Sequence, residues 1–225
     1  AADCNGDGSW DAPHCTLQQA IFASSPGDVI MALPGVYEET IDFAGRNISL
    51  KSAAGMGMTF IDGQGNGPVV RFQANESPAC LMQGFTVTGG SASGGQAGGV
   101  AISSASPTIR DCRIQGNTSS DFGAGASTRN NAHPRFYDCV FVGNDAGRNG
   151  GGMIVDNGTV QLYRCEFIDN SADDSGGGLF ARNGANGVVT ACTFRGNQAH
   201  GEDGGGAFLD GVGLSLERCE FSSNS

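Results

Sequence analysis

The segment Cys165-Glu-Phe-Ile-Asp-Asn170 decides the fold, because close copies of it recur along the chain. The copies are Cys139-Val-Phe-Val-Gly-Asn144, Cys192-Thr-Phe-Arg-Gly-Asn197, Cys219-Glu-Phe-Ser-Ser-Asn224 and, with isoleucine in place of phenylalanine, Cys112-Arg-Ile-Gln-Gly-Asn117. The five cysteines are spaced by 27, 26, 27 and 27 residues. A period of this size indicates a solenoid, a propeller or an array of repeats.

The composition selects a β-solenoid among these repeat architectures. The chain has 38 glycines in 225 residues, more than twice the usual share of about 7%, and glycine weakens helix interiors. Short β-type runs such as Gly152–Asp156 and Val160–Asp169 lie between the glycine clusters. The sequence therefore predicts an all-β fold, a parallel β-helix with about 26 to 28 residues per coil.

Three residue columns are predicted to stack inside this solenoid. Side chains alternate along a strand, so each cysteine and the apolar residue two positions later share the inward face. Asparagine follows five positions after each cysteine, where stacked amides can form a ladder. The structural columns are Cys112, Cys139, Cys165, Cys192 and Cys219; Phe141, Phe167, Phe194 and Phe221; and Asn117, Asn144, Asn170, Asn197 and Asn224.

The two ends of the chain differ. Thr16 can cap a short helix from Leu17 to Ala23 that covers the first coil, whereas the last residues are a repeat without a cap. We expect either a fragment of a longer protein or an open end that docks on another molecule. The predicted division is a disulfide-closed N-terminal loop with its capping helix (1–25), irregular opening coils (26–84) and regular repeat coils (85–225), in one continuous domain.

These motifs carry a family resemblance. Phe167-Ile-Asp-Asn170 and its copies resemble the FxxN motif of polymorphic outer membrane protein repeats, and Gly205-Gly-Ala-Phe208 resembles their companion GGAI motif. The stretch from Cys15 to Ile21, with Gly27–Ile30, Pro34–Tyr37 and Asn47–Leu50, is similar to the first coils of secreted β-helix proteins of the pectin-lyase-like superfamily. That resemblance implies a right-handed, single-stranded parallel β-helix, and it implies fold more strongly than activity.

The N-terminal loop carries two motifs, a pair of cysteines suited to a disulfide and a possible calcium-binding loop. Cys4 and Cys15 stand outside the repeats and are expected to form a disulfide, whereas the other six cysteines are expected to be buried thiols. Asp3-Cys-Asn-Gly-Asp-Gly8 matches the opening of a calcium loop, with Asp3, Asn5, Asp7 and Asp11 as the candidate ligands. The alternative is a plain Asn/Asp/Gly turn, because His14 replaces the closing glutamate. Calcium is the only cofactor that the sequence suggests.

Several outward columns carry charges or apolar groups. Arg129, Asp156, Arg182 and Asp210 alternate in sign from coil to coil and predict a salt-bridge ladder, and an Asp138–Arg164 pair is predicted one residue before the cysteines. Val140, Val142 and Ile168 are predicted to share an exposed sheet face, with Tyr137 and Tyr163 stacked further back on the same strands. Such a surface is either a contact site or is covered by another segment.

Bulk properties exclude some functions. The net charge is −11 with a single lysine, which argues against nucleic-acid binding, and no apolar run reaches the roughly 20 residues of a membrane span. We expect an exported protein, extracellular or at the cell surface. The motifs of polygalacturonases and alginate epimerases are absent, and His14, His133 and His200 occupy unrelated settings, so no catalytic residues are assigned.

The leading hypothesis is a non-enzymatic structural protein: a rigid stalk, an adhesin passenger or a filament subunit. Its partners would be further copies of itself, stacked head to tail, or further repeats of a longer chain. The alternative is a β-helix protein that binds or cleaves polysaccharide, with cell-surface glycans as partners and the tyrosines stacking on sugar rings.

Overall fold

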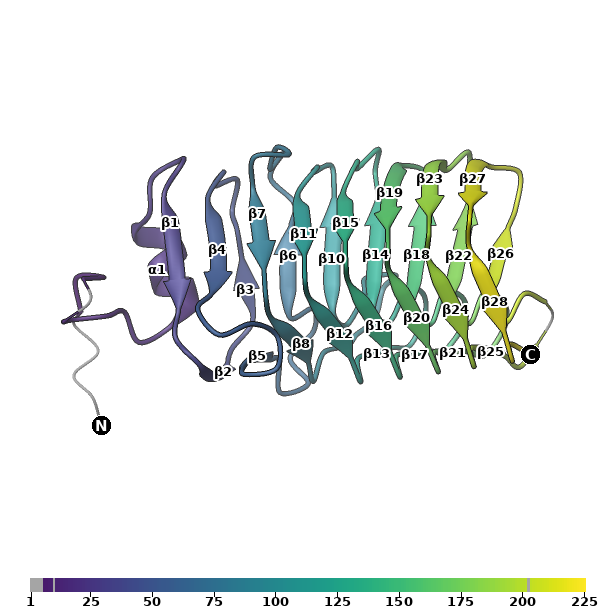
Figure 1. Ribbon diagram of the computed structural model, residues 1–225, viewed down its shortest axis with the longest axis horizontal. Helices are drawn as coiled ribbons and strands as arrows, with labels where there is room; N and C mark the ends of the chain where they lie inside the picture. The colour runs from purple at the N-terminus through teal and green to yellow at the C-terminus, as the bar shows by residue number, and fades with distance from the viewer. Residues whose placement is uncertain (1–5, 10, 202) are drawn as a thin grey trace.

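A computed structural model shows a rod of stacked coils, closed at its N-terminal end by one helix (Figure 1). It describes residues 6–9, 11–201 and 203–225. The first two coils contribute strands to sheets A, B and C, and the coils from β7 to β26 contribute strands to sheets A, B, D and C in turn; all strands that are neighbours within a sheet run parallel. The predicted parallel β-helix is confirmed.

Sheets A and B lie toward the viewer in Figure 1. Sheet A contains β1 (Val29–Ala32), β4 (Ser49–Ser52), β7 (Leu81–Gln83), β11 (Thr108–Arg110), β15 (Arg135–Tyr137), β19 (Thr159–Tyr163), β23 (Asn186–Thr190) and β27 (Gly213–Glu217). Sheet B contains β2 (Gly35–Glu38), β5 (Thr59–Asp62), β8 (Thr86–Thr88), β12 (Arg113–Gln115), β16 (Val140–Val142), β20 (Glu166–Ile168), β24 (Thr193–Arg195) and β28 (Glu220–Ser222).

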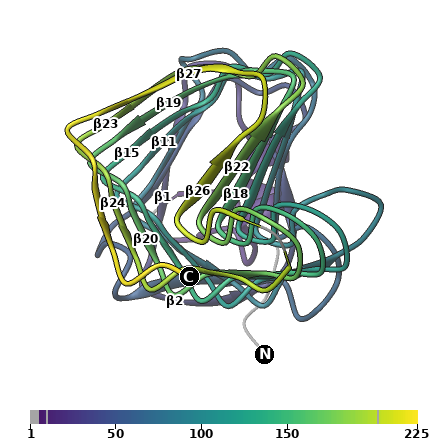
Figure 2. The ribbon, with the colours of Figure 1, turned by 90° about the vertical axis from the view of Figure 1, so that its right-hand side faces the viewer.

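Sheets D and C complete each coil and surround the hollow seen along the axis in Figure 2, which side chains fill. Sheet D contains β9 (Ser91–Ala92), β13 (Thr118–Ser119), β17 (Asp145–Ala146), β21 (Ser171–Ala172) and β25 (Gln198–Ala199). Sheet C contains β3 (Ile41–Asp42), β6 (Val70–Phe72), β10 (Val100–Ser103), β14 (Ala126–Arg129), β18 (Met153–Asp156), β22 (Leu179–Arg182) and β26 (Ala207–Leu209).

Single residues with left-handed backbone form two corners of each regular coil. The residue before each cysteine has a positive φ and separates sheet A from sheet B: Asp111, Asp138, Arg164, Ala191 and Arg218. The residue before each asparagine does the same between sheets B and D. The asparagine itself does not have a positive φ. Asparagine instead serves through its side chain.

The interior columns form as predicted. The rings of Phe141, Phe167, Phe194 and Phe221 stack at centroid distances of 4.6–4.7 Å. Asn144 Nδ2 donates to Asn170 Oδ1 at 2.9 Å, and Asn170 Nδ2 donates to Asn197 Oδ1 at the same distance. Each amide also donates to a carbonyl of the preceding coil, as Asn170 does to Phe141. The ladder therefore satisfies the amides of fully buried asparagines.

The N-terminal helix α1 (Leu17–Ala23) covers the first coil, also as predicted. Thr16 caps it by accepting a hydrogen bond from the backbone N–H of Gln19. Glu39 accepts from the N–H groups of Leu17 and Gln18, which satisfies the first-turn donors that a helix leaves open. Leu17 and Ile21 are buried. The helix thus shields the apolar end of the core.

Six cysteines are free thiols: Cys80, Cys112, Cys139, Cys165, Cys192 and Cys219. This confirms the expectation for the cysteines beyond the N-terminal loop. Cys4 lies outside the described residues, so the Cys4–Cys15 disulfide stays a prediction. Within the described residues, no helix is long and apolar enough to cross a membrane.

Candidate ligand-binding face

Two tyrosines mark the outer side of sheet A. Tyr137 on β15 lies opposite Tyr163 on β19, and their rings are parallel within 7° at a centroid distance of 5.2 Å. The guanidinium of Arg110, on the preceding strand β11, lies 4.2 Å from the centre of the Tyr137 ring, a cation–π geometry. The sequence-predicted tyrosine stack is therefore present, and Arg110 extends it by one coil.

An ion pair flanks the tyrosine stack at the corner between sheets A and B. Arg164 donates from Nε and Nη2 to the two carboxylate oxygens of Asp138, both at 2.7 Å. These hydrogen bonds hold the pKa of the Asp138 carboxyl below its ordinary value. One coil earlier, Gln83 Nε2 donates to Asp111 Oδ2 at 2.8 Å. The corner thus carries a row of oriented polar groups, and the predicted Asp138–Arg164 pair is confirmed.

The predicted contact surface divides between two sheets. Val140 and Val142 lie on β16 and Ile168 on β20, all three half-buried on the outer side of sheet B. The tyrosines lie on the strands of sheet A, beyond the left-handed corner, so their expected position on the same strands was wrong. The sequence run appeared continuous, but the positive φ at Asp138 and Arg164 breaks it into two strands.

Charge distribution sets this side of the rod apart. We define the tyrosine face as the outward residues of sheets A and B together with the corner residues between them. It holds seven of the twelve cationic residues of the chain: Lys51, Arg110, Arg113, Arg135, Arg164, Arg195 and Arg218. It also holds seven of the 23 acidic residues: Glu38, Asp62, Asp111, Asp138, Glu166, Glu217 and Glu220. The face is therefore charge-balanced, and the whole net charge of −11 resides elsewhere.

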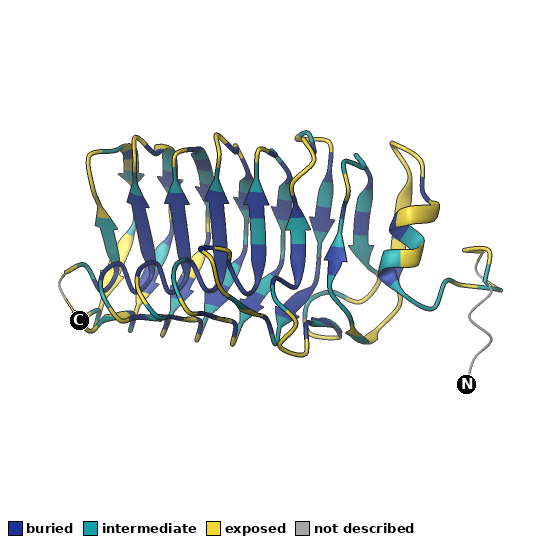
Figure 3. Cartoon of the chain, turned by 180° about the vertical axis from the view of Figure 1, so that it is seen from behind, coloured by how far each residue is buried: buried dark blue, intermediate teal, exposed yellow. Residues whose placement is uncertain are grey.

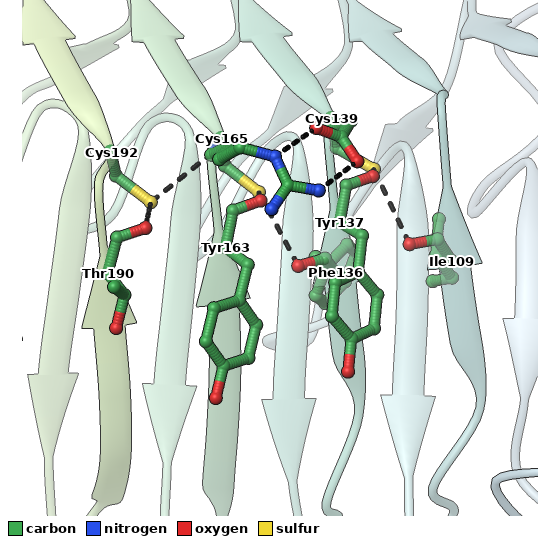
Figure 4. A network of polar contacts seen from close by, with 10 residues as sticks. Ile109, Phe136, Tyr137, Cys139, Tyr163, Cys165, Thr190 and Cys192 are labelled. Carbon is green, nitrogen blue, oxygen red and sulfur yellow. Dashed lines mark hydrogen bonds and ion pairs between the residues drawn. The ribbon is translucent and has the colours of Figure 1, made fainter.

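The cysteine column lies beside the tyrosines, at the corner between sheets A and B (Figure 4). Cys139 and Cys165 direct their thiols at backbone carbonyls of the preceding coil, and Cys192 Sγ lies 3.3 Å from the backbone nitrogen of Cys165. Burial raises the pKa of Cys112 to about 12 and that of Cys165 well above its ordinary value. Since a thiolate is the reactive form, these cysteines are packing groups rather than nucleophiles.

The tyrosine face is better equipped for binding than for acid–base catalysis. A general acid needs a carboxyl group that keeps its proton near neutral pH, and Asp138 is shifted in the opposite direction. His133 precedes β15 and His200 follows β25, so neither lies on the strands that carry the tyrosines. What the face offers is aromatic surface beside oriented hydrogen-bonding groups.

The calcium prediction is only partly accessible. Asp3 and Asn5 lie outside the described residues. Asp7 accepts a hydrogen bond from the backbone N–H of Ser9 at 2.9 Å, which is typical of a local turn. No cluster of three or more histidine, cysteine or acidic side chains suited to a metal occurs among the residues that the structure describes. Calcium binding by Asp3, Asn5, Asp7 and Asp11 stays a prediction.

The predicted salt-bridge ladder on sheet C forms only in part. Arg182 Nη2 lies 2.9 Å from Asp156 Oδ2, but Arg129 and Asp210 make no ion pair within the described part of the chain. Asp156 turns to Arg182 and Asn183 rather than to Arg129. Sequence reasoning also missed the contact of the Arg148 guanidinium with the ring of Phe122. Both are loop residues outside the repeat register and therefore carry no periodic signal.

The coiled architecture and its stacked interior define a parallel β-helix protein. The sequence pattern of the family described as "Right handed beta helix region" matches residues 48–221, and the chain belongs to this family. The predicted right-handed β-helix is thereby confirmed.

Two solved structures resemble the whole rod. The pectin methylesterase of the rice weevil matches with a TM-score of 0.50 and 10% sequence identity, covering 100% of this chain and 90% of its own. The pectin methylesterase of Aspergillus niger matches with a TM-score of 0.46 and 14% identity, covering 95% and 83%. The rice weevil structure supports the pectin-lyase-like fold and, at this identity, nothing further. No curated protein matches the chain.

Proposed function

We propose that the protein binds an extended polysaccharide along its tyrosine face. The observation that carries the proposal is the Tyr137–Tyr163 stack, with Arg110 on one side and the Asp138–Arg164 pair at its edge. Because Arg110 and Tyr163 cover the two faces of the Tyr137 ring, the stack offers ring edges and hydroxyl groups to a sugar, while arginine and carboxylate groups hydrogen-bond to its hydroxyl groups. Balanced charge on this face avoids the repulsion that the rest of the protein would exert on an acidic glycan.

The similarity in fold supports a carbohydrate ligand. The rice weevil protein is a pectin methylesterase, so this architecture presents a polysaccharide-acting surface in that protein. For the present chain we propose binding without cleavage, because Arg164 keeps Asp138, the carboxylate at the edge of the tyrosine stack, in its ionised form, and an ionised carboxylate cannot be the general acid that glycosidic hydrolysis needs. We also propose that the protein acts outside the cell, where such polysaccharides occur.

The test is binding to a panel of neutral and acidic polysaccharides, measured with wild type, Tyr163→Ala and Tyr163→Phe. We expect Tyr163→Ala to weaken binding about tenfold or more, equivalent to about 1.4 kcal/mol, whereas Tyr163→Phe retains the ring. Gln198→Ala, at an exposed position on β25 of sheet D and outside the tyrosine face, is the control and should leave binding unchanged. Absence of binding across the panel, or equal binding by Tyr163→Ala, would refute the proposal. New reducing ends or unsaturated products would show an enzyme instead.

A structural role is a second proposal: the rod as a stalk, an adhesin passenger or a filament subunit assembling end to end. Its supporting observation is the uninterrupted phenylalanine column, which gives a stiff and uniform rod. The likeness of the FxxN and GGAF motifs to polymorphic outer membrane protein repeats belongs to this proposal. Negative-stain electron microscopy tests it. Filaments would support self-assembly, and isolated rods at high concentration would oppose the filament subunit but agree with a stalk or an adhesin passenger.

A further inference from the structure

A second layer of buried side chains lies outside the main core, against the outer side of sheet C. The loops from sheet D to sheet C fold back over this side, as the view from behind shows (Figure 3). Ile154 and Phe180 point outward from sheet C and are nevertheless buried. Phe180 also stacks on Phe208, with ring centroids 5.5 Å apart. These loops therefore create an interior on the back of the rod.

Three arginines surround one phenylalanine in this layer. The guanidinium groups of Arg129, Arg148 and Arg182 lie 5.6, 5.0 and 4.5 Å from the ring centre of Phe122. Arg182 pairs with Asp156 at 2.9 Å and Arg148 with Asp174 at 3.4 Å. Arg129 has no carboxylate within ion-pair distance in the described chain. Its contact with the face of an aromatic ring does not replace a counter-charge.

The hydrogen-bonding groups of Arg129 are incomplete as well. Its Nε and Nη2, together with Nε of Arg182, are buried without a hydrogen-bond partner. Burial lowers the pKa of Arg129, since a desolvated guanidinium is less stable in its charged form. A buried cation without hydrogen bonds destabilises a fold. The charges of Asp156 and Asp121 act on Arg129 from beyond hydrogen-bond distance, so the cluster is short of hydrogen-bond acceptors, and the shortage is centred on Arg129.

A polar pocket opens beside this arginine. It measures about 470 Å³ and is lined by Arg129, Asn130, Asp156, Asn157 and Asn183. The three asparagines occupy the same left-handed turn in successive coils, with φ between 51° and 56°. Asn130 donates to Ser103 and Asn183 to Asp156, which leaves their amide oxygens oriented to accept hydrogen bonds. The pocket thus places the incompletely hydrogen-bonded guanidinium of Arg129 beside asparagine amides suited to hydroxyls, and its one carboxylate, Asp156, is already paired with Arg182.

We propose that this pocket binds a sugar acid through its carboxylate. A guanidinium pairs with a carboxylate in a two-pronged geometry, and the asparagine amides match the hydroxyl groups of the sugar ring. Asp156 in the pocket wall and the overall charge of −11 disfavour a dianion such as phosphate. The site accepts one carboxylate rather than a dense polyanion, and it is separate from the tyrosine face on the opposite sheets.

The test measures binding of glucuronate, galacturonate, glucose and inorganic phosphate by calorimetry, with thermal unfolding in parallel. Wild type should bind the sugar acids and unfold at a higher temperature in their presence. Arg129→Gln should lower their affinity about tenfold or more. Arg71→Gln, which removes a half-buried arginine from β6 of sheet C, away from both the pocket lining and the tyrosine face, is the matched control and should retain wild-type affinity.

Arg129→Gln should fold at least as well as wild type without ligand, because it removes a half-buried cation whose Nε and Nη2 have no hydrogen-bond partner. Should it fail to fold, Arg129→Lys keeps the positive charge but lacks the two-pronged guanidinium, and it should bind sugar acids more weakly than wild type. Equal binding of glucose or phosphate, no binding by wild type, or unchanged affinity in the folded variant would each overturn the proposal. Tyr163→Ala should retain sugar-acid binding, so that failure of the tyrosine face and failure of this pocket are distinguishable.

Discussion

The regular coils (85–225) and the opening coils (26–84) share sheets A, B and C but satisfy their buried polar groups differently. In the regular coils one residue type serves every level, since each asparagine bonds to the next. The asparagine ladder ends at Gly90, whose N–H donates to Asn117, and it does not continue into the opening coils. Single-use contacts replace it there. Repetition therefore allows one solution to be copied, whereas irregular coils need a separate one at each turn.

The largest effect is expected from truncating the aromatic column. Phe167 is fully buried and stacks on Phe141 and Phe194, so Phe167→Ala should lower the free energy of unfolding by about 3–5 kcal/mol. Ile61→Ala, in the same column of the opening coils, removes fewer carbon atoms and should cost less. Chemical denaturation measures both. Phe167→Leu is the volume control, expected at about 1 kcal/mol; equal losses in all three variants would contradict the stacking account.

Breaking the asparagine ladder should come next. Asn170→Ala leaves the backbone N–H of Asn144 and the carbonyl of Phe141 without their partners, at a cost of about 2–4 kcal/mol. Asn66→Ala, at an exposed turn, is the control and should change stability by less than about 0.5 kcal/mol. Equal midpoints for the two variants in urea would show that the ladder contributes little.

The corresponding test in the opening coils is Glu76. It is 1% exposed and accepts hydrogen bonds from the backbone N–H groups of Gly45 and Ala74 at 2.9 and 3.0 Å. Glu76→Gln keeps one acceptor oxygen, so we expect a loss of about 1–2 kcal/mol. Glu38→Gln on the exposed edge of β2 should be neutral. Hydrogen exchange would locate the weakening; protection lost in the regular coils instead would argue against local solutions.

A substitution at a left-handed corner should stabilise the protein. Ala191 has a φ of 53°, which disfavours a residue with a Cβ. Ala191→Gly relieves this strain and outweighs the greater freedom of glycine in the unfolded chain by about 0.5 kcal/mol. Ala54→Gly, where φ is not positive, should destabilise slightly. Thermal unfolding measures both shifts, and a lower midpoint for Ala191→Gly would contradict the corner's role.

The Asp138–Arg164 pair should have the smallest effect because both side chains are largely exposed, at 36% and 61%. Asp138→Asn should cost no more than about 1 kcal/mol at pH 7. The folded-state pKa of Asp138 is lowered, so its stabilisation is complete above the unfolded pKa of about 3.9. It is lost as the pH falls through the lower, folded value. The free energies of unfolding of wild type and Asp138→Asn, measured from pH 7 to pH 2, should converge at low pH. A difference between them that persists at pH 2 would rule out the ion pair as its source.

Sequence alone predicted the interior far better than the exterior. The cysteine, phenylalanine and asparagine columns recur with one period and face a shared core, so spacing sufficed to place them. The helix Leu17–Ala23 was equally clear from its cap and apolar face. Burial imposes these patterns in every coil, and they are therefore visible in one sequence.

Outer positions escaped prediction because no shared environment constrains them. Tyr137 and Val140 were predicted to lie on one strand but lie on two sheets. The corner between them has a positive φ at Asp138, and the residue types at this corner do not indicate such a backbone. Arg129 was assigned to a ladder because its spacing fits, but Asp156 has only two carboxylate oxygens and both are taken by the following coil. Phe122 lies in a loop whose sequence differs from one coil to the next. Competition between neighbours, rather than periodicity, decides these contacts.

The register of the coils has a mechanical consequence. Thr108 lies opposite Arg135, and Arg135 lies opposite Gln161, so each strand is held by the coil before and the coil after. Tension applied along the rod axis pulls perpendicular to the strands and loads the hydrogen bonds of one coil boundary at a time. The rod would then unfold coil by coil, and each coil of about 27 residues would release about 90 Å of extended chain.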